Sequence, residues 1–175
     1  IQPLPSQKIS LENACGLRLA ESINSPVDSP PFDKSMVDGF AISTSDPHPT
    51  LRILEEVTAG QVPQHAVVPG TTIRVMTGAP LPKGADAMVK WEEVQLVDEQ
   101  TIAAPQTTPA GPSGPGGGQP TPKGPRIPKG HCVLPRGTAF RSGQPLLASG
   151  TRLSPIDIGL LAEIGRDQVV ARPRP

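Results

Sequence analysis

The sequence predicts a mainly β protein with short helices, an α+β fold, and its composition carries that prediction. Among 175 residues there are 24 prolines and 18 glycines, which interrupt regular structure at short intervals. Large aromatic side chains are scarce, with three Phe, one Trp and no Tyr, so the core must be built from Val, Ile and Leu. The apolar runs are short and bounded by turn residues, a pattern typical of strands. We therefore expect short, irregular strands and few helices.

The N-terminal end predicts a short helix followed by a strand. Residues 9–16 favour a two-turn helix, with Ser10 as the N-cap and Gly16 in the left-handed conformation after the last turn. Residues 17–23 alternate between apolar and polar side chains and predict a strand. We interpret both elements as scaffold.

Residues 30–41, PPFDKSMVDGFA, predict a rigid loop. The prolines fix φ and make the entry stiff, and Asp38-Gly39 is expected to form a tight turn because Gly tolerates positive φ. Such a loop would hold Asp33 and Asp38 in set directions. A turn anchored in the core by its two Phe side chains, with its charges in water, explains the same pattern.

Three further strands are expected in the middle of the chain, at residues 51–57, 72–77 and 87–97. The second ends in TGAPLPKGADA, which would deliver the Thr77 hydroxyl at a strand end. Gly78 would leave backbone amides uncovered for the oxygen atoms of a ligand. A plain β-turn explains the glycine and the prolines of this motif equally well.

The composition changes abruptly at residues 101–129, which are rich in Pro, Gly, Thr and Ser. Such a stretch predicts a mobile linker, because it cannot bury enough apolar surface to offset its ordering entropy. Order is expected to return at residues 132–153. Ser154-Pro155-Ile156-Asp157 then predicts a helix start with a capping box, Gly165 ends that helix, and residues 168–171 predict a last strand.

Charge and cysteine content exclude several classes of function. Sixteen basic residues balance sixteen acidic ones, so we expect neither nucleic acid nor an anionic membrane as a partner. No apolar run is long enough to span a bilayer and no signal peptide is evident, so a cytoplasmic protein is expected. Cys15 and Cys132 lack metal-ligand spacing and are expected to be free thiols. The two ends of the chain are typical of a piece of a longer protein.

Two motifs resemble those of one family. Residues 30–41 resemble PxFDNSAMDGYA, the signature of the MoeA and gephyrin E-domain family, the molybdopterin molybdenumtransferases of molybdenum cofactor synthesis. Residues 76–89 are nearly identical to that family's MTGAPLPEGADAVV. The beginning of the chain resembles LEEALGRVLAEDI, and residues 143–165 resemble GxxLLxAGTRLxPxxIGLLASLG. In the signature loop, the residues that differ from the family are Lys34, Met36, Val37 and Phe40.

The resemblance implies a MoeA N-terminal-region-like fold, in which a compact β domain is inserted into an elongated α/β domain. The inserted domain would comprise residues 26–100, and the discontinuous domain residues 1–25 and 130–175. Residues 101–129 would form a flexible linker. The molybdopterin-binding domain with TGDE, GGVS and PGNP stretches does not occur in this chain.

The resemblance also implies a reaction. The family transfers molybdenum from molybdate to molybdopterin, starting from adenylylated molybdopterin and releasing AMP, with Mg²⁺ as helper. Asp38 and Thr77 fall on positions implicated in the family's active site and are the candidate catalytic residues. The weaker candidates for substrate binding are Asp33, Ser35, Gly78 and Lys83. The sequence assigns no metal ligand.

One departure leaves two hypotheses open. The family's NIRxxGED stretch corresponds to residues 132–139, which places Thr138 and Ala139 where the acids belong. The first hypothesis is the N-terminal region of a molybdenum insertase, forming one wall of a cleft shared in a homodimer. The second is a dimerisation or scaffold module that has lost the chemistry. A simple sugar- or peptide-binding β domain has no motif to support it.

Overall fold

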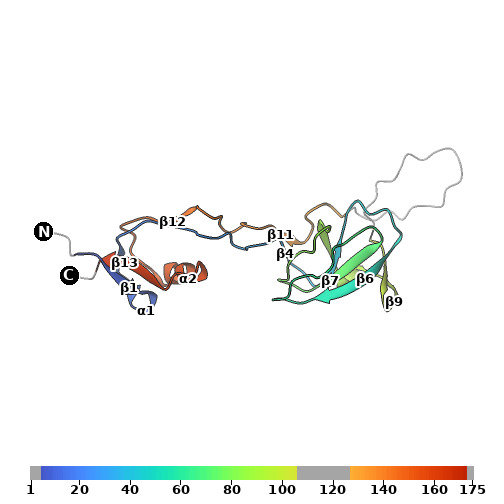
Figure 1. Cartoon of the computed structure of the whole chain (residues 1–175), viewed down its shortest axis with the longest axis horizontal. Helices are drawn as coiled ribbons and strands as arrows, with labels where there is room; N and C mark the ends of the chain where they lie inside the picture. Colours follow the sequence, from blue (N-terminus) through green and yellow to red (C-terminus); the bar gives the residue numbers. More distant parts are fainter. Residues whose placement is uncertain (1–4, 106–126, 173–175) are drawn as a thin grey trace, which may run out of the picture. The chain divides into compact units, whose positions relative to one another are not determined.

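The computed structural model describes residues 5–105 and 127–172. The chain divides into two compact units (Figure 1). Unit 1 is formed by the two ends of the chain, Ile1–Pro31 and Gly137–Pro175, and unit 2 by Phe32–Arg136. The regular structure of the described residues is mainly β, with two short α-helices, which confirms the predicted fold class.

Unit 1 contains a small antiparallel sheet in the order β1-β13-β2 and a separate two-stranded pair, β3 with β12. Helices α1 and α2 complete the unit. Its elements are β1 (Gln7–Ser10), α1 (Leu11–Ala14), β2 (Arg18–Leu19), β3 (Ile23–Asn24), β12 (Pro145–Leu147), α2 (Pro155–Glu163) and β13 (Gln168–Arg172). Aliphatic side chains from both ends of the chain pack into one core, including Leu19, Ile23, Leu153, Leu161 and Val169.

The helix start predicted near residue 155 is confirmed. The Ser154 side chain accepts a hydrogen bond from the Asp157 backbone N–H, the Asp157 carboxylate accepts one from the Ser154 N–H, and Pro155 is the first helical residue. Gly165 follows the helix with a φ of 78°. No helix in the described residues is long and apolar enough to cross a membrane.

The first predicted helix is shorter than expected. Helix α1 has four residues, because Ile9 and Ser10 pair with Val169 and Gln168 of β13. The Ser10 hydroxyl makes no cap bond to the helix backbone and instead accepts a hydrogen bond from the Asn13 amide at 3.1 Å. Strand pairing far along the chain therefore overrides the local helix signal.

Unit 2 is built on a sheet of six strands in the order β8-β5-β7-β6-β10-β9. Neighbouring strands are antiparallel except β6 and β7, which are parallel. A second pair joins β4 (Lys34–Ser35) to β11 (Val133–Leu134). The sheet strands are β5 (Gly39–Ile42), β6 (Thr50–Val57), β7 (Thr71–Val75), β8 (Ala87–Lys90), β9 (Leu96–Asp98) and β10 (Thr101–Ala103).

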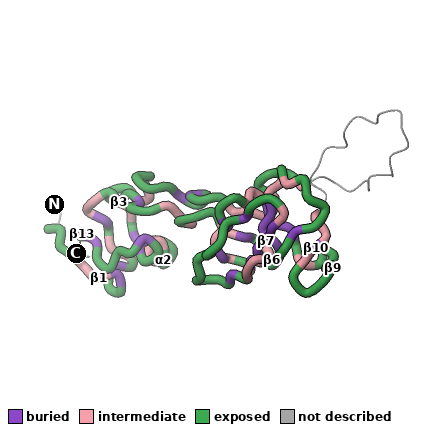
Figure 2. Tube along the Cα trace, turned by 45° about the vertical axis from the view of Figure 1, so that its right-hand side comes forward, coloured by how far each residue is buried: buried purple, intermediate pink, exposed green. Residues whose placement is uncertain are grey.

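Two apolar clusters in unit 2 use alternate side chains of β5. Figure 2 shows buried residues of this unit, in purple, around β6 and β7. Ala41 belongs to one cluster, with Ile73, Val75 and Met88. Phe40 and Ile42 belong to the other, with Leu51, Val89 and Ile102. Successive side chains of a strand point to opposite faces, so β5 is covered on both faces by apolar groups.

Two predictions about strands in unit 2 need correction. The strand predicted over residues 87–97 is interrupted, because the 3₁₀ turn η1 (Trp91–Glu93) separates β8 from β9. The linker predicted over residues 101–129 begins with β10, which pairs with both β6 and β9 and buries Ile102 completely. Residues 106–126 of that linker lie outside the described residues.

The predicted Asp38-Gly39 turn is also wrong. Gly39 is the first residue of β5, pairs with Val75 and Lys90, and does not have a positive φ. It is required for a different reason, since a Cβ atom there would lie 1.8 Å from the Val89 carbonyl oxygen. Only glycine allows β5 to lie this close to β8.

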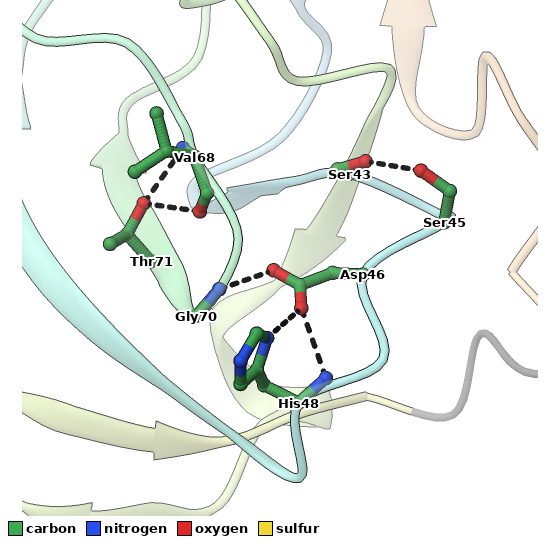
Figure 3. A network of polar contacts seen from close by, with 7 residues as sticks. All are labelled: Ser43, Ser45, Asp46, His48, Val68, Gly70 and Thr71. Carbon is green, nitrogen blue, oxygen red and sulfur yellow. Dashed lines mark hydrogen bonds and ion pairs between the residues drawn. The ribbon is translucent and has the colours of Figure 1, made fainter.

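A buried carboxylate holds the loop before β6 against the start of β7 (Figure 3). Asp46 accepts hydrogen bonds from the Gly70 N–H at 2.8 Å, from the His48 N–H at 3.0 Å and from the His48 ring at 2.7 Å. Burial by itself would raise the pKa of Asp46, but these bonds outweigh it and lower that pKa. The Thr71 hydroxyl bonds both main-chain groups of Val68 in the same turn. The long connection between the parallel strands is thereby fixed where it enters β7.

We predict that Gly39→Ala lowers the free energy of unfolding of unit 2 by about 3 kcal/mol, the upper end of the usual cost of overpacking, because the clash is with main-chain atoms that cannot move aside. Denaturant unfolding followed by fluorescence of Trp91, the single Trp, reports on this unit. The control is Gly159→Ala in α2, where a Cβ has open space. It should leave the Trp91 transition unchanged and stabilise α2 by about 0.5–1 kcal/mol. Equal Trp91 transitions in wild type and Gly39→Ala would contradict the packing argument.

Candidate functional site

The two motifs meet at one edge of the unit 2 sheet. The parallel strands β6 and β7 end side by side, with Val57 paired to Val75. Gly39, which begins β5, also pairs with Val75. The residue before β5 and the residues after β7 therefore lie at the same edge of the sheet. These residues are Asp38 of the signature loop and Thr77 of the second motif.

Asp38 and Thr77 are joined directly. One carboxylate oxygen of Asp38, Oδ1, accepts the Thr77 backbone N–H at 2.6 Å and the Thr77 hydroxyl at 2.7 Å. These bonds, the backbone one first and the hydroxyl second, lower the pKa of Asp38, and the positive charge of Arg74 lowers it further. Desolvation acts in the opposite direction but does not reverse the change. Asp38 is therefore an exposed, ionised carboxylate at neutral pH, with one oxygen fixed.

The main chain of Asp38 is held as firmly as its side chain. Its carbonyl accepts the Trp91 N–H at 3.1 Å, and the next residue, Gly39, is locked between two strands. Within the described residues, the second carboxylate oxygen of Asp38, Oδ2, has no hydrogen-bond partner. This oxygen can therefore accept a hydrogen bond or a cation from outside the chain.

The amides of the second motif are not uncovered, contrary to the expectation for Gly78. The Thr77 N–H donates to Asp38, the Gly78 N–H donates to the Ser35 carbonyl at 2.9 Å, and the Ala79 N–H donates to the Met76 carbonyl at 3.1 Å. Gly78 is needed for its conformation, because its φ is 85°. The loop uses its amides to hold itself against the signature loop, and none of these three is left for ligand oxygens.

Asp33 and Ser35 hold the signature loop in place. The Ser35 side chain is buried; its hydroxyl donates to the Val37 carbonyl at 2.5 Å and accepts the Val37 N–H at 3.2 Å. The Asp33 carboxylate accepts the Arg136 N–H at 2.7 Å, and its carbonyl accepts the Leu81 N–H at 2.8 Å. Both residues therefore have internal hydrogen-bond partners, and Ser35 is closed to a ligand.

Lys83 lies in a different part of the loop. Its carbonyl accepts the Val67 N–H at 2.8 Å, and its exposed side chain makes no hydrogen bond or ion pair with the described residues. The neighbouring Gly84 has a φ of 85°, and a Cβ atom there would lie 2.1 Å from the Val67 oxygen. No contact joins Lys83 to Asp38 or Thr77 among the described residues.

The positions where the family's acids were expected lie in unit 1. The Ala139 N–H donates to the Ser29 carbonyl at 2.9 Å, and Phe140 forms a β-bridge with Ser29. Ala139 is exposed and presents a methyl group in place of a carboxylate. Among the residues that the structure describes, no group of three or more His, Cys, Asp or Glu side chains is placed to hold a metal ion.

Sequence reasoning missed a cation beside the site. The Arg74 guanidinium carbon lies 4.0 Å from the centre of the Trp91 ring, and its Nη1 is 2.9 Å from a Glu56 carboxylate oxygen. The Trp91 ring in turn stacks on Phe40, with 5.3 Å between ring centres. One signal was present in the sequence, because Arg74 is the only charged residue of β7 and precedes Thr77 by three positions.

Comparison with known proteins adds the family. Residues 1–165 match the family model described as the MoeA N-terminal region, domains I and II. The chain belongs to this family. Over 110 residues it is 36% identical to a molybdopterin molybdenumtransferase of Staphylococcus aureus, covering 58% of this chain and 26% of the relative. It is likewise 36% identical over 104 residues to one of Haemophilus influenzae, covering 57% of this chain and 26% of that relative.

Solved structures extend the similarity to nearly the whole chain. A molybdopterin biosynthesis MoeA protein from Pyrococcus horikoshii matches with a TM-score of 0.80 and 28% sequence identity, over 99% of this chain and 41% of that protein. A second structure of a MoeA protein from Pyrococcus horikoshii matches with a TM-score of 0.74 and 29% identity. The chain thus spans about two-fifths of the length of these structural relatives and about a quarter of the curated relatives above.

We predict that Thr77→Val raises the pKa of Asp38, because the valine lacks the hydroxyl donor and retains only the backbone N–H. Thr77→Ser keeps the hydroxyl and should leave that pKa close to the wild-type value. Carbon-detected NMR titration of the Asp side chains measures both effects. An Asp38 pKa that is the same in Thr77→Val and in wild type would contradict the direct hydrogen bond.

Proposed function

We propose that this chain forms one wall of the active site of a molybdopterin molybdenumtransferase, with Asp38 and Thr77 as its catalytic residues. The observation that carries the proposal is the hydrogen-bonded pair itself. Two motifs 39 positions apart in the sequence join through an exposed carboxylate and a hydroxyl at one sheet edge. Both residues are exposed, so the pair faces solvent.

The substrates proposed from the family are molybdate and adenylylated molybdopterin, with AMP as the released product. An efficient general base at neutral pH has a pKa near 7, but the Thr77 bonds lower the pKa of Asp38. We therefore assign Asp38 the role of a fixed negative charge that orients its partner, and not that of a proton acceptor. The Thr77 side chain keeps Oδ1 in place and leaves Oδ2 directed to the substrate.

Mg²⁺ fits this arrangement as an ion bound jointly by Asp38 and the substrate. Mg²⁺ is usually bound through one or two carboxylates together with waters and substrate phosphates, so a single exposed carboxylate is a sufficient protein contribution. Asp38 Oδ2 is the atom of this chain that would hold it. The bound ion would supply neutralisation of charge on the phosphate chain.

The weaker candidates receive different roles in this proposal. Lys83 remains a candidate for contact with substrate phosphates, because its side chain is exposed and has no partner among the described residues. Asp33, Ser35 and Gly78 support the shape of the two loops through their internal hydrogen bonds and backbone conformation.

The remaining parts of the active site would come from elsewhere. We propose that a molybdopterin-binding domain outside this chain completes the cleft in a homodimer, as the resemblance implies. Ala139 favours one alternative, a dimerisation or scaffold module, because a methyl group cannot replace a carboxylate near a metal ion or a phosphate. That alternative requires the full-length protein to be folded and inactive.

We predict that Asp38→Asn lowers molybdate-dependent AMP release from adenylylated molybdopterin by roughly 100-fold in the full-length protein, the scale for loss of a preorganised electrostatic contact. The matched control is Asp98→Asn. Asp98 is also exposed and also accepts a backbone N–H, from Gln100, but it lies in the edge strand β9. Unchanged activity in Asp38→Asn would remove Asp38 from the mechanism. A folded wild-type protein without activity would favour the scaffold.

A further inference from the structure

Arg74 is held on two sides at the edge of the sheet where Asp38 and Thr77 meet. Its register partners are Phe40 on β5 and Glu56 on β6. The guanidinium carbon lies over the Trp91 ring, 4.0 Å from the ring centre, and Nη1 is 2.9 Å from a Glu56 carboxylate oxygen. A planar cation packed on an aromatic ring and paired with a carboxylate has little freedom to move.

Trp91 couples this cation to the signature loop. Its ring carries Arg74 on one side and stacks with Phe40, while its backbone N–H donates to the carbonyl of Asp38. Arg74 lies three residues before Thr77, whose side chain binds the Asp38 carboxylate. The same small set of residues therefore fixes the positions of the cation and of the carboxylate.

The contacts with Glu56 and Trp91 stabilise the arginine, but its position also carries a cost. Its Nε is buried and has no hydrogen-bond partner in the described residues, and a buried donor without a partner costs about 1–3 kcal/mol. A methionine would fill a similar volume without that cost. The charge of the guanidinium is what a neutral side chain could not supply.

The charges around Arg74 indicate whether it binds an anionic ligand or acts as a counter-ion within the protein. Glu56 is paired with Arg74, whose positive charge also lowers the pKa of Asp38, and Lys90 is paired with Glu93 at 3.7 Å on the neighbouring elements β8 and η1. The other charged residues of the signature loop, Asp33 and Lys34, have opposite charges that cancel in the sum. The cluster is not positive, so Arg74 does not make it a receptor for an oxyanion. Arg74 acts as the counter-ion of carboxylates.

We propose that Arg74 is a positioning residue for Asp38, and that Trp91 and Glu56 act by holding the guanidinium near the strand ends where that carboxylate lies. Arg74 pairs with Phe40, two positions after Asp38, and side chains two positions apart on a strand share one face. This inference rests on the proposed function, because it assumes that Asp38 is the group presented to the substrate. Water is expected to leave the site when the cleft is closed, and a carboxylate loses solvation at that point. A fixed cation nearby keeps Asp38 ionised and directed toward Thr77 under those conditions.

We predict that Arg74→Met raises the pKa of Asp38 in this chain, as measured by carbon-detected NMR titration, because the positive charge is lost. The matched control is Arg52→Met, which removes the same charge from β6 at a position paired with Thr71, at the other end of the sheet. Arg52 is four positions from Glu56 along β6, a distance of about 13 Å, which exceeds the screening length of about 8–10 Å. Arg52→Met should therefore leave the pKa of Asp38 unchanged.

Two further variants separate charge from packing. Arg74→Lys keeps a cation but loses the planar stack, so its Asp38 pKa should lie between those of wild type and Arg74→Met. Trp91→Leu keeps Arg74 but removes its support, and should raise the pKa in the same direction. Amide spectra that overlay with wild type verify that each variant is folded. A folded Arg74→Met with the wild-type Asp38 pKa would overturn the proposal. If Arg74→Met does not fold, a folded Trp91→Leu with the wild-type Asp38 pKa would overturn it instead.

Activity separates this inference from the proposed function. In the full-length protein, Arg74→Met should move the acid side of the pH profile of AMP release to higher pH, since Asp38 stays protonated over a wider range. If Asp38→Asn is fully active, the proposed function fails, and with it the assumption on which Arg74 was assigned. If Asp38→Asn is inactive while Arg74→Met has the wild-type pH profile, only the role of Arg74 is overturned.

Discussion

The close approach of β5 to β8 is the constraint on which the site depends. At Gly39 the two backbones are so near that a single added carbon would overlap the Val89 carbonyl. This contact fixes β5 between β7 and β8, and it sets where the strand begins. Because Asp38 is the residue immediately before that point, its main chain has one available position, beside the end of β7. Backbone packing thereby places a carboxylate next to a hydroxyl from a distant segment.

The hydrogen bonds of the two loops also follow from this placement. The backbone N–H groups of Thr77, Gly78 and Ala79 all have partners within the protein. The loops therefore do not form a cradle of free amides of the kind that binds phosphate. What remains for a ligand is side-chain chemistry, namely one carboxylate oxygen of Asp38 with its charge supported by Thr77 and Arg74. A site of this kind suits a cation or a polar donor, and the negative substrate would have to reach it through such a group.

Much of the fold was predictable from local signals. The strand over residues 51–57 and the capping box of α2 both depend on side chains that act within a short stretch. The errors have a common cause, which is long-range pairing. Strand β13 converts the start of a predicted helix into strand, and β6 recruits Thr101–Ala103 from a stretch with the composition of a linker. Gly39 was read as a turn residue, because the approach of β8 cannot be seen from its sequence neighbours.

In the candidate site too, the residues were predictable from motifs, whereas the contacts between distant segments were not. The motifs identified Asp38 and Thr77, but they could not indicate that one oxygen of Asp38 would bind both donors of Thr77. Arg74 was visible only as a charge in an apolar strand, and its significance depends on Trp91 and Glu56, which come from two other elements. The sequence identifies such residues, but strand pairing in the sheet determines how they lie relative to one another.

The most direct measurement is a double-mutant cycle on molybdate-dependent AMP release, with Asp38→Asn, Thr77→Val and the combined variant in the full-length protein. If the pair acts as one unit, the combined variant should be hardly slower than Asp38→Asn alone, because the role of Thr77 is exerted through that carboxylate. If the two losses multiply, Thr77 and Asp38 act independently, and the central claim that one hydrogen-bonded pair forms the site is wrong.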